Sequence, residues 1–224
     1  MNATQDKLVT GGADGKLVVV DKNGNTLKSK EAHKTAVNTV KFHPHQPWVI
    51  SGGDDQVVSL WNMNGGNPLQ SRHHSKAVTS VDVHVSGDYV LSTSLDATSR
   101  IFDINDMKPI STFTDPEHSP LSVGAFHPDG MLFAAGSEDN TVKLWNINAK
   151  KCASTLPLGG KATSIAFSQN GFYFATASAD GILKLWDLRK SVTVSTVQLE
   201  GVPQHIAFDD SGRFVAVGYG KQMA

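Results

Sequence analysis

The sequence has little cysteine, no dominant charge and no long apolar run. Cys152 is the only cysteine among 224 residues, so no disulfide can form within the chain and a reducing compartment is expected. The 20 Lys and Arg residues nearly balance the 21 Asp and Glu residues, which excludes a strongly basic nucleic-acid binder and an acidic tail. No apolar run approaches the roughly 20 residues that cross a bilayer. The first residues, MNATQD, lack the pattern of a signal peptide, so we expect a soluble chain that is not secreted.

What the sequence does have is a period. Apolar–Asp/Asn pairs close five short β-like runs at steps of 41, 41, 43 and 41 residues: Val20-Asp21, Trp61-Asn62, Phe102-Asp103, Trp145-Asn146 and Trp186-Asp187. An aspartate stands six residues before the first member of each pair, at Asp14, Asp55, Asp96, Asp139 and Asp180. A third series keeps the same period at Phe42, Val83, Phe126, Phe167 and Phe208. Three markers with one period indicate internal repeats across the chain.

Each repeat carries the same local pattern. An alternating strand such as residues 37–42 is followed by a turn, a small-residue strand such as 172–178, a tight Asp turn and a third strand such as 182–186. A weaker fourth strand, for example 192–194, trails behind. Four short strands per repeat without helical periodicity predict an all-β chain. Because one such sheet cannot bury both faces alone, we expect a β-propeller in which each sheet covers the next.

The segments 178–187 and 136–146 resemble the signature of the WD40 repeat family, and the resemblance covers essentially the whole chain. In that family a His, a Ser or Thr, the turn Asp and the Trp form a buried hydrogen-bonded set. The resemblance implies one full set and partial sets, made up of His33, Ser51, Asp55, Trp61, His74, Ser92, Asp96, Asp139, Trp145, Thr176, Asp180 and Trp186. Phe102 replaces one Trp, and Leu158 stands where another repeat would have its His.

Segments 125–133, 164–173, 8–14 and 186–190 resemble more closely the propeller of spliceosome-associated U-box ubiquitin ligases. That resemblance implies a nuclear protein whose propeller recruits splicing-complex subunits or ubiquitination substrates in pre-mRNA splicing, with DNA repair as a second setting. It also implies a U-box that carries the ligase activity and a coiled coil that drives homo-oligomer formation. Nothing in this chain resembles either part, so we expect no catalytic residues here.

The repeat pattern predicts an incomplete propeller. The chain opens at a second strand, Lys7–Thr10, and closes after another second strand at 213–218. We therefore expect a single propeller domain, residues 1–224, with about five and a half blades of the seven that the resemblance implies. Seven periods need about 290 residues, so about 70 would be absent. In the alternative, a five-bladed ring, the strand ending at Phe208 would complete the first repeat and leave 214–217 spare.

Three motifs invite chemical hypotheses that the pattern does not favour. His33, Ser51 and Asp55 have the residue types of a catalytic triad, but Ser51 would lie inside a packed strand. The histidine pairs at 43/45 and 73/74 lack the spacing of zinc ligands. Gly11–Lys16 lacks the spacing and the following helix of a phosphate loop, and we expect a hairpin turn there.

We therefore expect a protein-binding platform with no cofactor, no metal, no direct nucleic-acid ligand and no membrane contact. Loops differ between repeats while strands recur, so specificity should lie in the loops. The expected contact residues are Lys34, Asp54, Lys76, Leu95, Glu138 and Arg189.

Two alternatives remain open. Residues 186–189, Trp-Asp-Leu-Arg, also resemble the motif of WD40 substrate receptors of cullin ligases, and the chain could be another WD40 scaffold.

The basic pairs 150–151 and 189–190 would form a solvated edge on one rim. A propeller hydrolase would require clustered acidic or metal-binding residues that the repeats do not contain.

Overall fold

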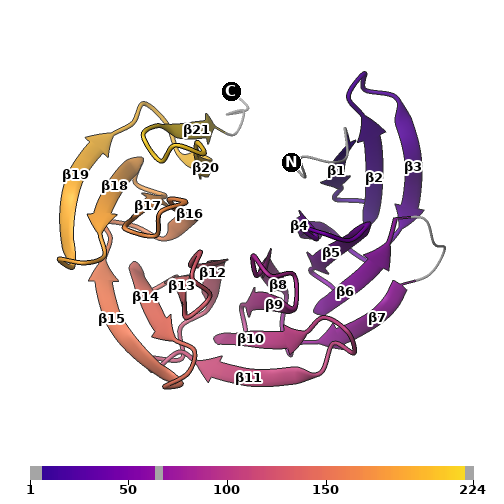
Figure 1. Cartoon of the computed structure of the whole chain (residues 1–224), viewed down its shortest axis with the longest axis horizontal. Coiled ribbons are helices and arrows are strands. Elements are labelled where there is room, and N and C mark those ends of the chain that lie inside the picture. The colour runs from indigo at the N-terminus through magenta and orange to yellow at the C-terminus, as the bar shows by residue number, and fades with distance from the viewer. Residues whose placement is uncertain (1–6, 64–67, 220–224) are drawn as a thin grey trace. The chain divides into compact units, whose positions relative to one another are not determined.

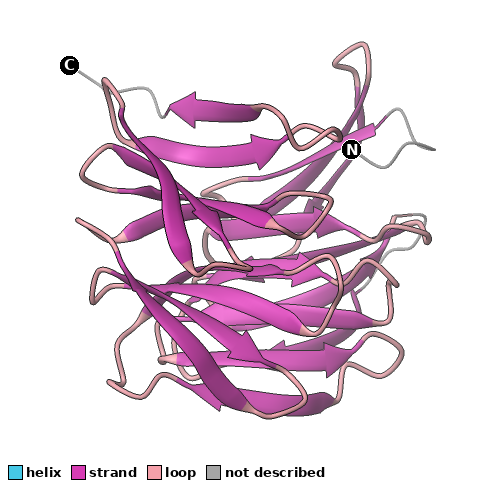
Figure 2. Ribbon diagram, turned by 60° about the vertical axis from the view of Figure 1, so that its left-hand side comes forward, coloured by secondary structure: helices cyan, strands magenta, loops and turns pink. Residues whose placement is uncertain are grey.

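The computed structural model describes residues 7–63 and 68–219, and every regular element there is a β-strand (Figure 2). The prediction of an all-β chain is confirmed. The described strands form antiparallel sheets whose strands follow one another in sequence, and we call these sheets blades 1 to 6. The chain divides into two compact units, Met1–His118 and Ser119–Ala224, and each is described by itself.

The first unit contains blades 1, 2 and 3 (Figure 1). Blade 1 consists of β1 (Lys7–Gly11), β2 (Lys16–Asp21) and β3 (Thr26–Glu31). Blade 2 consists of β4 (Val37–Phe42), β5 (Trp48–Gly53), β6 (Val57–Asn62) and β7 (Pro68–His73). Blade 3 consists of β8 (Val78–Val83), β9 (Tyr89–Ser94), β10 (Thr98–Asp103) and β11 (Pro109–Thr114).

The second unit contains blades 4, 5 and 6. Blade 4 consists of β12 (Leu121–Phe126), β13 (Leu132–Ser137), β14 (Thr141–Asn146) and β15 (Lys151–Pro157). Blade 5 consists of β16 (Ala162–Phe167), β17 (Tyr173–Ser178), β18 (Ile182–Asp187) and β19 (Val192–Gln198). Blade 6 consists of β20 (Pro203–Phe208) and β21 (Val215–Tyr219).

The incomplete first and last blades agree with the repeat pattern. Among the described residues blade 1 has three strands and blade 6 has two. Residues 215–217 of the segment that the five-bladed alternative left spare lie in β21, which pairs with β20 through partners such as Phe208 and Val215. The prediction of a single domain is not tested by this description and stays a prediction.

The hydrophobic core of each unit lies between neighbouring blades. In the first unit Leu17 of blade 1 packs with Val37, Val49 and Trp61 of blade 2. A second cluster joins blades 2 and 3 around the fully buried Phe102. In the second unit one cluster joins blades 4 and 5, and a smaller one joins blades 5 and 6. Each large apolar side chain buried in this way contributes about 1.5–3 kcal/mol, so the contact between sheets stabilises blades that could not fold singly.

The Asp turn between the second and third strands demands one left-handed residue. The position after the turn aspartate has a φ between +64° and +79° in all five described turns, at Gly15, Gln56, Ala97, Asn140 and Gly181. Glycine adopts this conformation without steric cost, whereas the other side chains adopt it because the surrounding hydrogen bonds hold the turn. The Gly11–Lys16 segment is one of these hairpins, as predicted, and it joins β1 to β2.

A histidine at the end of the first strand fastens one blade to the next. His43 Nδ1 accepts hydrogen bonds from the backbone N–H groups of His45 and Gln46, at 3.0 and 2.8 Å, so Nε2 carries the proton and donates to the Gly87 carbonyl at 2.9 Å. In the second unit His127 Nε2 donates to the Gly171 carbonyl at 2.8 Å. The repeat therefore uses the same bond between blades 2 and 3 and between blades 4 and 5.

Replacing Gly171 by alanine should destabilise the second unit. Its φ is +71°, and an added Cβ would lie 2.7 Å from His127 Cε1 and 2.9 Å from Nε2. Strain of the left-handed backbone costs about 1–2 kcal/mol and overpacking adds about 1–3 kcal/mol. Gly24→Ala is the matched control, since Gly24 has a φ of +84° and nothing within 4 Å. Urea unfolding should therefore show a clearly larger loss for Gly171→Ala, and equal losses would contradict a role for the His127 contact.

The stability of the fold should also depend on the protonation of His43. Burial, with His45 nearby, lowers the pKa of His43 below its ordinary value of 6.5, although the bond to Gly87 opposes this. The unfolded chain therefore takes up the proton first, and the stability contributed by neutral His43 is lost as the pH falls from about 6.5 through the lowered folded pKa. Unfolding free energies measured between pH 7.5 and 5 should fall more steeply for the wild-type chain than for His43→Gln. Parallel pH profiles would show that His43 does not titrate in this way.

Candidate functional site

The full hydrogen-bonded set predicted for blade 2 is assembled in the structure. His33 Nδ1 lies 2.8 Å from Asp55 Oδ1, His33 Nε2 lies 2.7 Å from Ser51 Oγ, and the Trp61 indole N–H donates to the same oxygen at 2.9 Å. Ser51 is fully buried. The set ties the loop before β4 to the Asp turn and to the third strand. It therefore links the loop before the blade, the second strand with its Asp turn, and the third strand.

Blade 3 repeats the arrangement without the indole. His74 bridges Asp96 at 2.9 Å and Ser92 at 2.7 Å, and Phe102 takes the place of tryptophan. Burial alone would raise the pKa of Asp96, but hydrogen bonds from His74, Thr98 and the Ser75 backbone outweigh it and hold that pKa far below its usual range. Asp96 is therefore a permanent anion that anchors the turn.

The second unit splits the set. In blade 4 Asp139 accepts a hydrogen bond from Lys143 Nζ at 2.6 Å, and Trp145 stacks on Phe133. In blade 5 the Trp186 indole N–H donates to Thr176 at 3.0 Å, while Asp180 is bonded to Ser178 at 2.5 Å instead of to a histidine. Sequence reasoning missed Lys143, a lysine between two apolar residues and four residues after the turn aspartate.

These geometries place the triad-like residues in a structural role. A serine nucleophile needs an accessible oxygen, and Ser51 Oγ is buried between an imidazole and an indole. Within residues 7–63 and 68–219 no group of three or more His, Cys, Asp or Glu side chains could hold a metal ion. The same residues contain no helix that is long and apolar enough to span a membrane.

Four of the predicted contact residues lie at one end of the blades in the first unit. We call this end the Asp-turn rim of unit 1, formed by turns 12–15, 54–56 and 95–97 and loops 32–36 and 74–77. Lys34, Asp54 and Lys76 are exposed there, and Leu95 is half-buried. Backbone bonds from Asp54 N to Ala36 O and from Leu95 N to Ala77 O, both 3.0 Å, hold the turns and loops together. The structure thus brings these four residues onto one surface.

A polar groove of about 650 Å³ opens at this rim between blades 1 and 2. Exposed Glu31, Lys34 and His73 line it together with the His33–Asp55 pair. The Lys34 backbone N–H donates to Asp55 Oδ2 at 3.0 Å, so the buried set positions the exposed lysine directly. Charges of both signs converge in a groove of the size that a peptide side chain or turn occupies.

Glu138 occupies the corresponding turn of blade 4. It is exposed and forms an ion pair with Lys161 Nζ at 2.6 Å, from the loop that precedes β16. The pair bridges blades 4 and 5 at the Asp-turn end of the second unit.

Arg189 does not share an end with the Asp turns. It lies in the turn after β18, at the opposite end of that strand from Asp180, and Lys150 occupies the matching turn one blade earlier. Its guanidinium donates to Asp187 Oδ2 at 2.8 Å and to the Tyr173 hydroxyl at 3.2 Å, and it lies 4.5 Å from the centre of the Phe172 ring. Its bonds therefore brace its own blade, although half of the side chain stays exposed.

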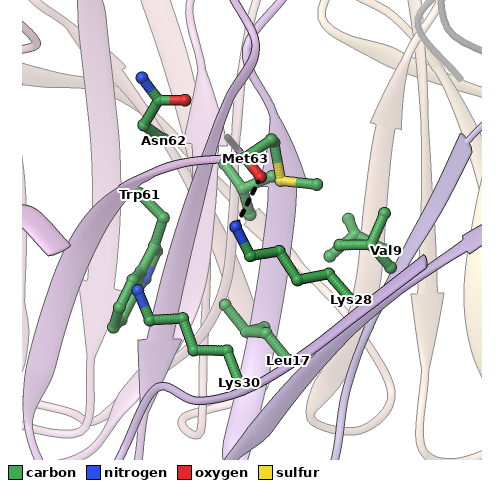
Figure 3. Close-up of a pocket in the computed structure, with 9 residues that line it drawn as sticks. Val9, Leu17, Lys28, Lys30, Trp61, Asn62 and Met63 are labelled. Atoms are coloured by element: carbon green, nitrogen blue, oxygen red, sulfur yellow. Dashed lines mark hydrogen bonds between the residues drawn. The ribbon is translucent and has the colours of Figure 1, made fainter. Parts of the chain in front are cut away.

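A second, apolar groove lies at the junction of blades 1 and 2 (Figure 3). It encloses a hollow of about 30 Å³ lined by Val9, Leu17, Val19, Lys28, Lys30, Val49, Trp61, Asn62 and Met63. Lys28 Nζ donates to the Met63 carbonyl at 3.1 Å, and Lys30 Nζ lies 4.2 Å from the centre of the Trp61 ring. We call this groove, with its nine lining residues, the Lys28–Lys30 groove. Nothing in the sequence pattern indicated a role for the two lysines.

Removing the hydroxyl of Ser51 should weaken the first unit strongly. Ser51→Ala would leave the buried Trp61 N–H and His33 Nε2 without their shared partner, at a cost of about 2–4 kcal/mol. The control is Ser59→Ala, which removes another buried hydroxyl that is hydrogen-bonded to Ser71 at 3.0 Å and should cost about 1 kcal/mol. Denaturant unfolding monitored by tryptophan fluorescence measures both values. A Ser51→Ala loss no larger than the control would refute the bridging role.

Comparison with known proteins agrees with this architecture. The family model described as "WD domain, G-beta repeat" matches residues 24–62, 66–103, 107–146 and 150–187. The chain is 37% identical over 166 residues to Pre-mRNA-processing factor 19 of Homo sapiens and of Bos taurus, which covers 72% of this chain and 33% of each relative. It is also 42% identical over 38 residues to WD repeat-containing protein 18 of Rattus norvegicus, 17% of this chain and 9% of that protein.

The chain thus spans about a third of the length of the first relatives that it matches. Four repeat matches, sheets of up to four antiparallel strands and the buried His–Ser–Asp–Trp set of blade 2 agree with one another. The fold is all-β and of the WD40 β-propeller class, and the chain belongs to the WD domain, G-beta repeat family.

Proposed function

We propose that this chain is a protein-binding scaffold that recruits partners or substrates for a nuclear ubiquitin ligase acting in pre-mRNA splicing. The observation that carries the proposal is the 37% identity over 166 residues to Pre-mRNA-processing factor 19, a protein whose name places it in pre-mRNA processing. The exposed Lys34, Asp54 and Lys76 on one rim support a binding role. DNA repair, oligomer formation and the action of residues 1–224 as one domain remain parts of this proposal that rest on resemblance alone.

The proposed mechanism is recruitment of a partner, without catalysis by this chain. Strands held by buried hydrogen bonds give each unit a rigid frame, and the loops at the Asp-turn rim present side chains that differ from blade to blade. A partner held there has a raised effective concentration near any catalytic domain linked to the scaffold. The purified chain should accordingly transfer no ubiquitin from a charged conjugating enzyme.

Charge reversal on the Asp-turn rim of unit 1 should disrupt partner binding. We expect Lys34→Glu/Lys76→Glu to reduce capture of splicing proteins from nuclear extract about 10-fold, since each exposed contact contributes on the order of 1 kcal/mol. Lys151→Glu is the control, because it reverses an exposed charge at the other end of a blade in the second unit. Quantitative mass spectrometry of the captured proteins supplies the measurement.

Two results would argue against the proposal. Capture without enrichment of splicing proteins would contradict the assignment to pre-mRNA splicing. An equal loss of captured protein in the rim variant and in the control would contradict the Asp-turn rim of unit 1 as the binding surface. If the wild-type chain instead captured a cullin adaptor and Arg189→Ala abolished this, the receptor alternative would replace it.

A further inference from the structure

Two of the residues that line the Lys28–Lys30 groove are lysines. Among the nine residues that line it, Lys28 and Lys30 are charged and none is a carboxylate. Burial, with the neighbouring Lys28, lowers the pKa of Lys30. The Lys28 ammonium group therefore disfavours the charged form of Lys30, and the apolar floor of Val9, Leu17 and Val49 supplies no opposite charge.

Register shows that Lys30 occupies a packing position of the repeat. Lys30 lies opposite Leu17 in blade 1, as Leu156 lies opposite Val142 in blade 4. Leu156 is buried in the cluster that contains Trp186, the counterpart of Trp61. The same register position is Arg72 in blade 2, Phe113 in blade 3 and Val197 in blade 5. A lysine at a position that an apolar residue fills elsewhere lowers local stability, and such departures concentrate at functional sites.

Blade 2 shows what a cation at this position does when its role is structural. The Arg72 guanidinium reaches across to the Asp106 carbonyl of blade 3 at 2.6 Å, and Gln70 reaches the Asn105 carbonyl at 2.8 Å. These two bonds join blade 2 to blade 3. Within the part of the chain that the structure describes, the Lys30 ammonium instead faces only the ring of Trp61, and no hydrogen-bond acceptor or carboxylate is paired with it.

We propose that the Lys28–Lys30 groove binds an acidic segment of a partner protein, with a carboxylate placed at the two ammonium groups and a neighbouring apolar side chain in the hollow beside Val9 and Leu17. This deepens the proposed scaffold function and rests on it. A carboxylate there would form charge-assisted hydrogen bonds with both lysines and remove their mutual repulsion. The hollow of about 30 Å³ admits the tip of an aliphatic side chain.

A nucleic acid fits this groove less well than a peptide. Single-stranded nucleic acids bind by stacking bases on exposed aromatic faces, and the Lys30 ammonium already lies over the face of Trp61. The floor consists of Val9, Leu17, Val19 and Val49, which cannot donate hydrogen bonds to base edges.

Fluorescence anisotropy with a labelled peptide of sequence Glu-Glu-Leu-Glu-Glu tests the proposal on the complete 224-residue chain. Lys30→Leu installs the residue type of Leu156 and should raise the Kd about 10-fold while leaving the melting temperature unchanged or higher. Lys30→Arg keeps the charge and should retain binding. Lys190→Leu removes an exposed charge in the second unit and should change the Kd less than about 2-fold.

Three results would overturn the proposal: no binding of the peptide by the wild-type chain at millimolar concentration, an unchanged Kd in Lys30→Leu, or an oligouridine that binds in its place and depends on Lys30. Failure of the scaffold function is a separate result, because it would abolish capture of splicing proteins by the wild-type chain whatever the peptide does. Loss of peptide binding in Lys30→Arg as well, with an unchanged melting temperature, would also count against the charge-based mechanism.

Discussion

Burial of one sheet against the next is the constraint on which the rest of each unit depends. A sheet of four short strands has two faces and cannot shield either one alone, so its apolar residues are stabilised only where a neighbouring sheet covers them. Trp61 meets the residues of blade 1, Phe102 lies in the cluster between blades 2 and 3, and Trp186 lies in the one between blades 4 and 5. The turns and the buried hydrogen bonds hold each strand in the position at which its apolar side chains contact the neighbouring sheet.

The same constraint explains why so much of the fold could be predicted from the sequence. A repeated contact between sheets requires the same residue type at the same place in every repeat, so the period of about 41 residues predicts strand after strand. The strands expected at 37–42 and 182–186 are β4 and β18, and the left-handed residue after each turn aspartate follows from the turn itself. The hydrogen-bonded set of blade 2 is expected from the resemblance to the WD40 repeat, and its four residues are joined by hydrogen bonds in the structure.

The features that sequence reasoning missed include a bond between two blades and side-chain contacts within a blade. His43 and Gly87 are joined by a hydrogen bond although they belong to different blades, and no pattern within one repeat predicts that bond. Lys143 replaces a histidine as the partner of Asp139 from a different strand, so the turn keeps its anchor while the motif disappears. Arg189, also expected to contact a partner, lies at the other end of its blade from the Asp turn, with Asp187 and Tyr173 as partners.

A residue that departs from the repeat pattern has a different effect on stability in a loop than at a junction between blades. At the rim, Lys34 and Lys76 occupy positions where solvent accepts almost any side chain, so their chemistry is free to vary without cost to the fold. At the junction, Lys30 stands where Leu156 packs in another blade, and burial together with the nearby Lys28 lowers the pKa of Lys30. A lysine at a packing position between blades is a departure from the repeat, and an anion supplied by another molecule would neutralise its charge.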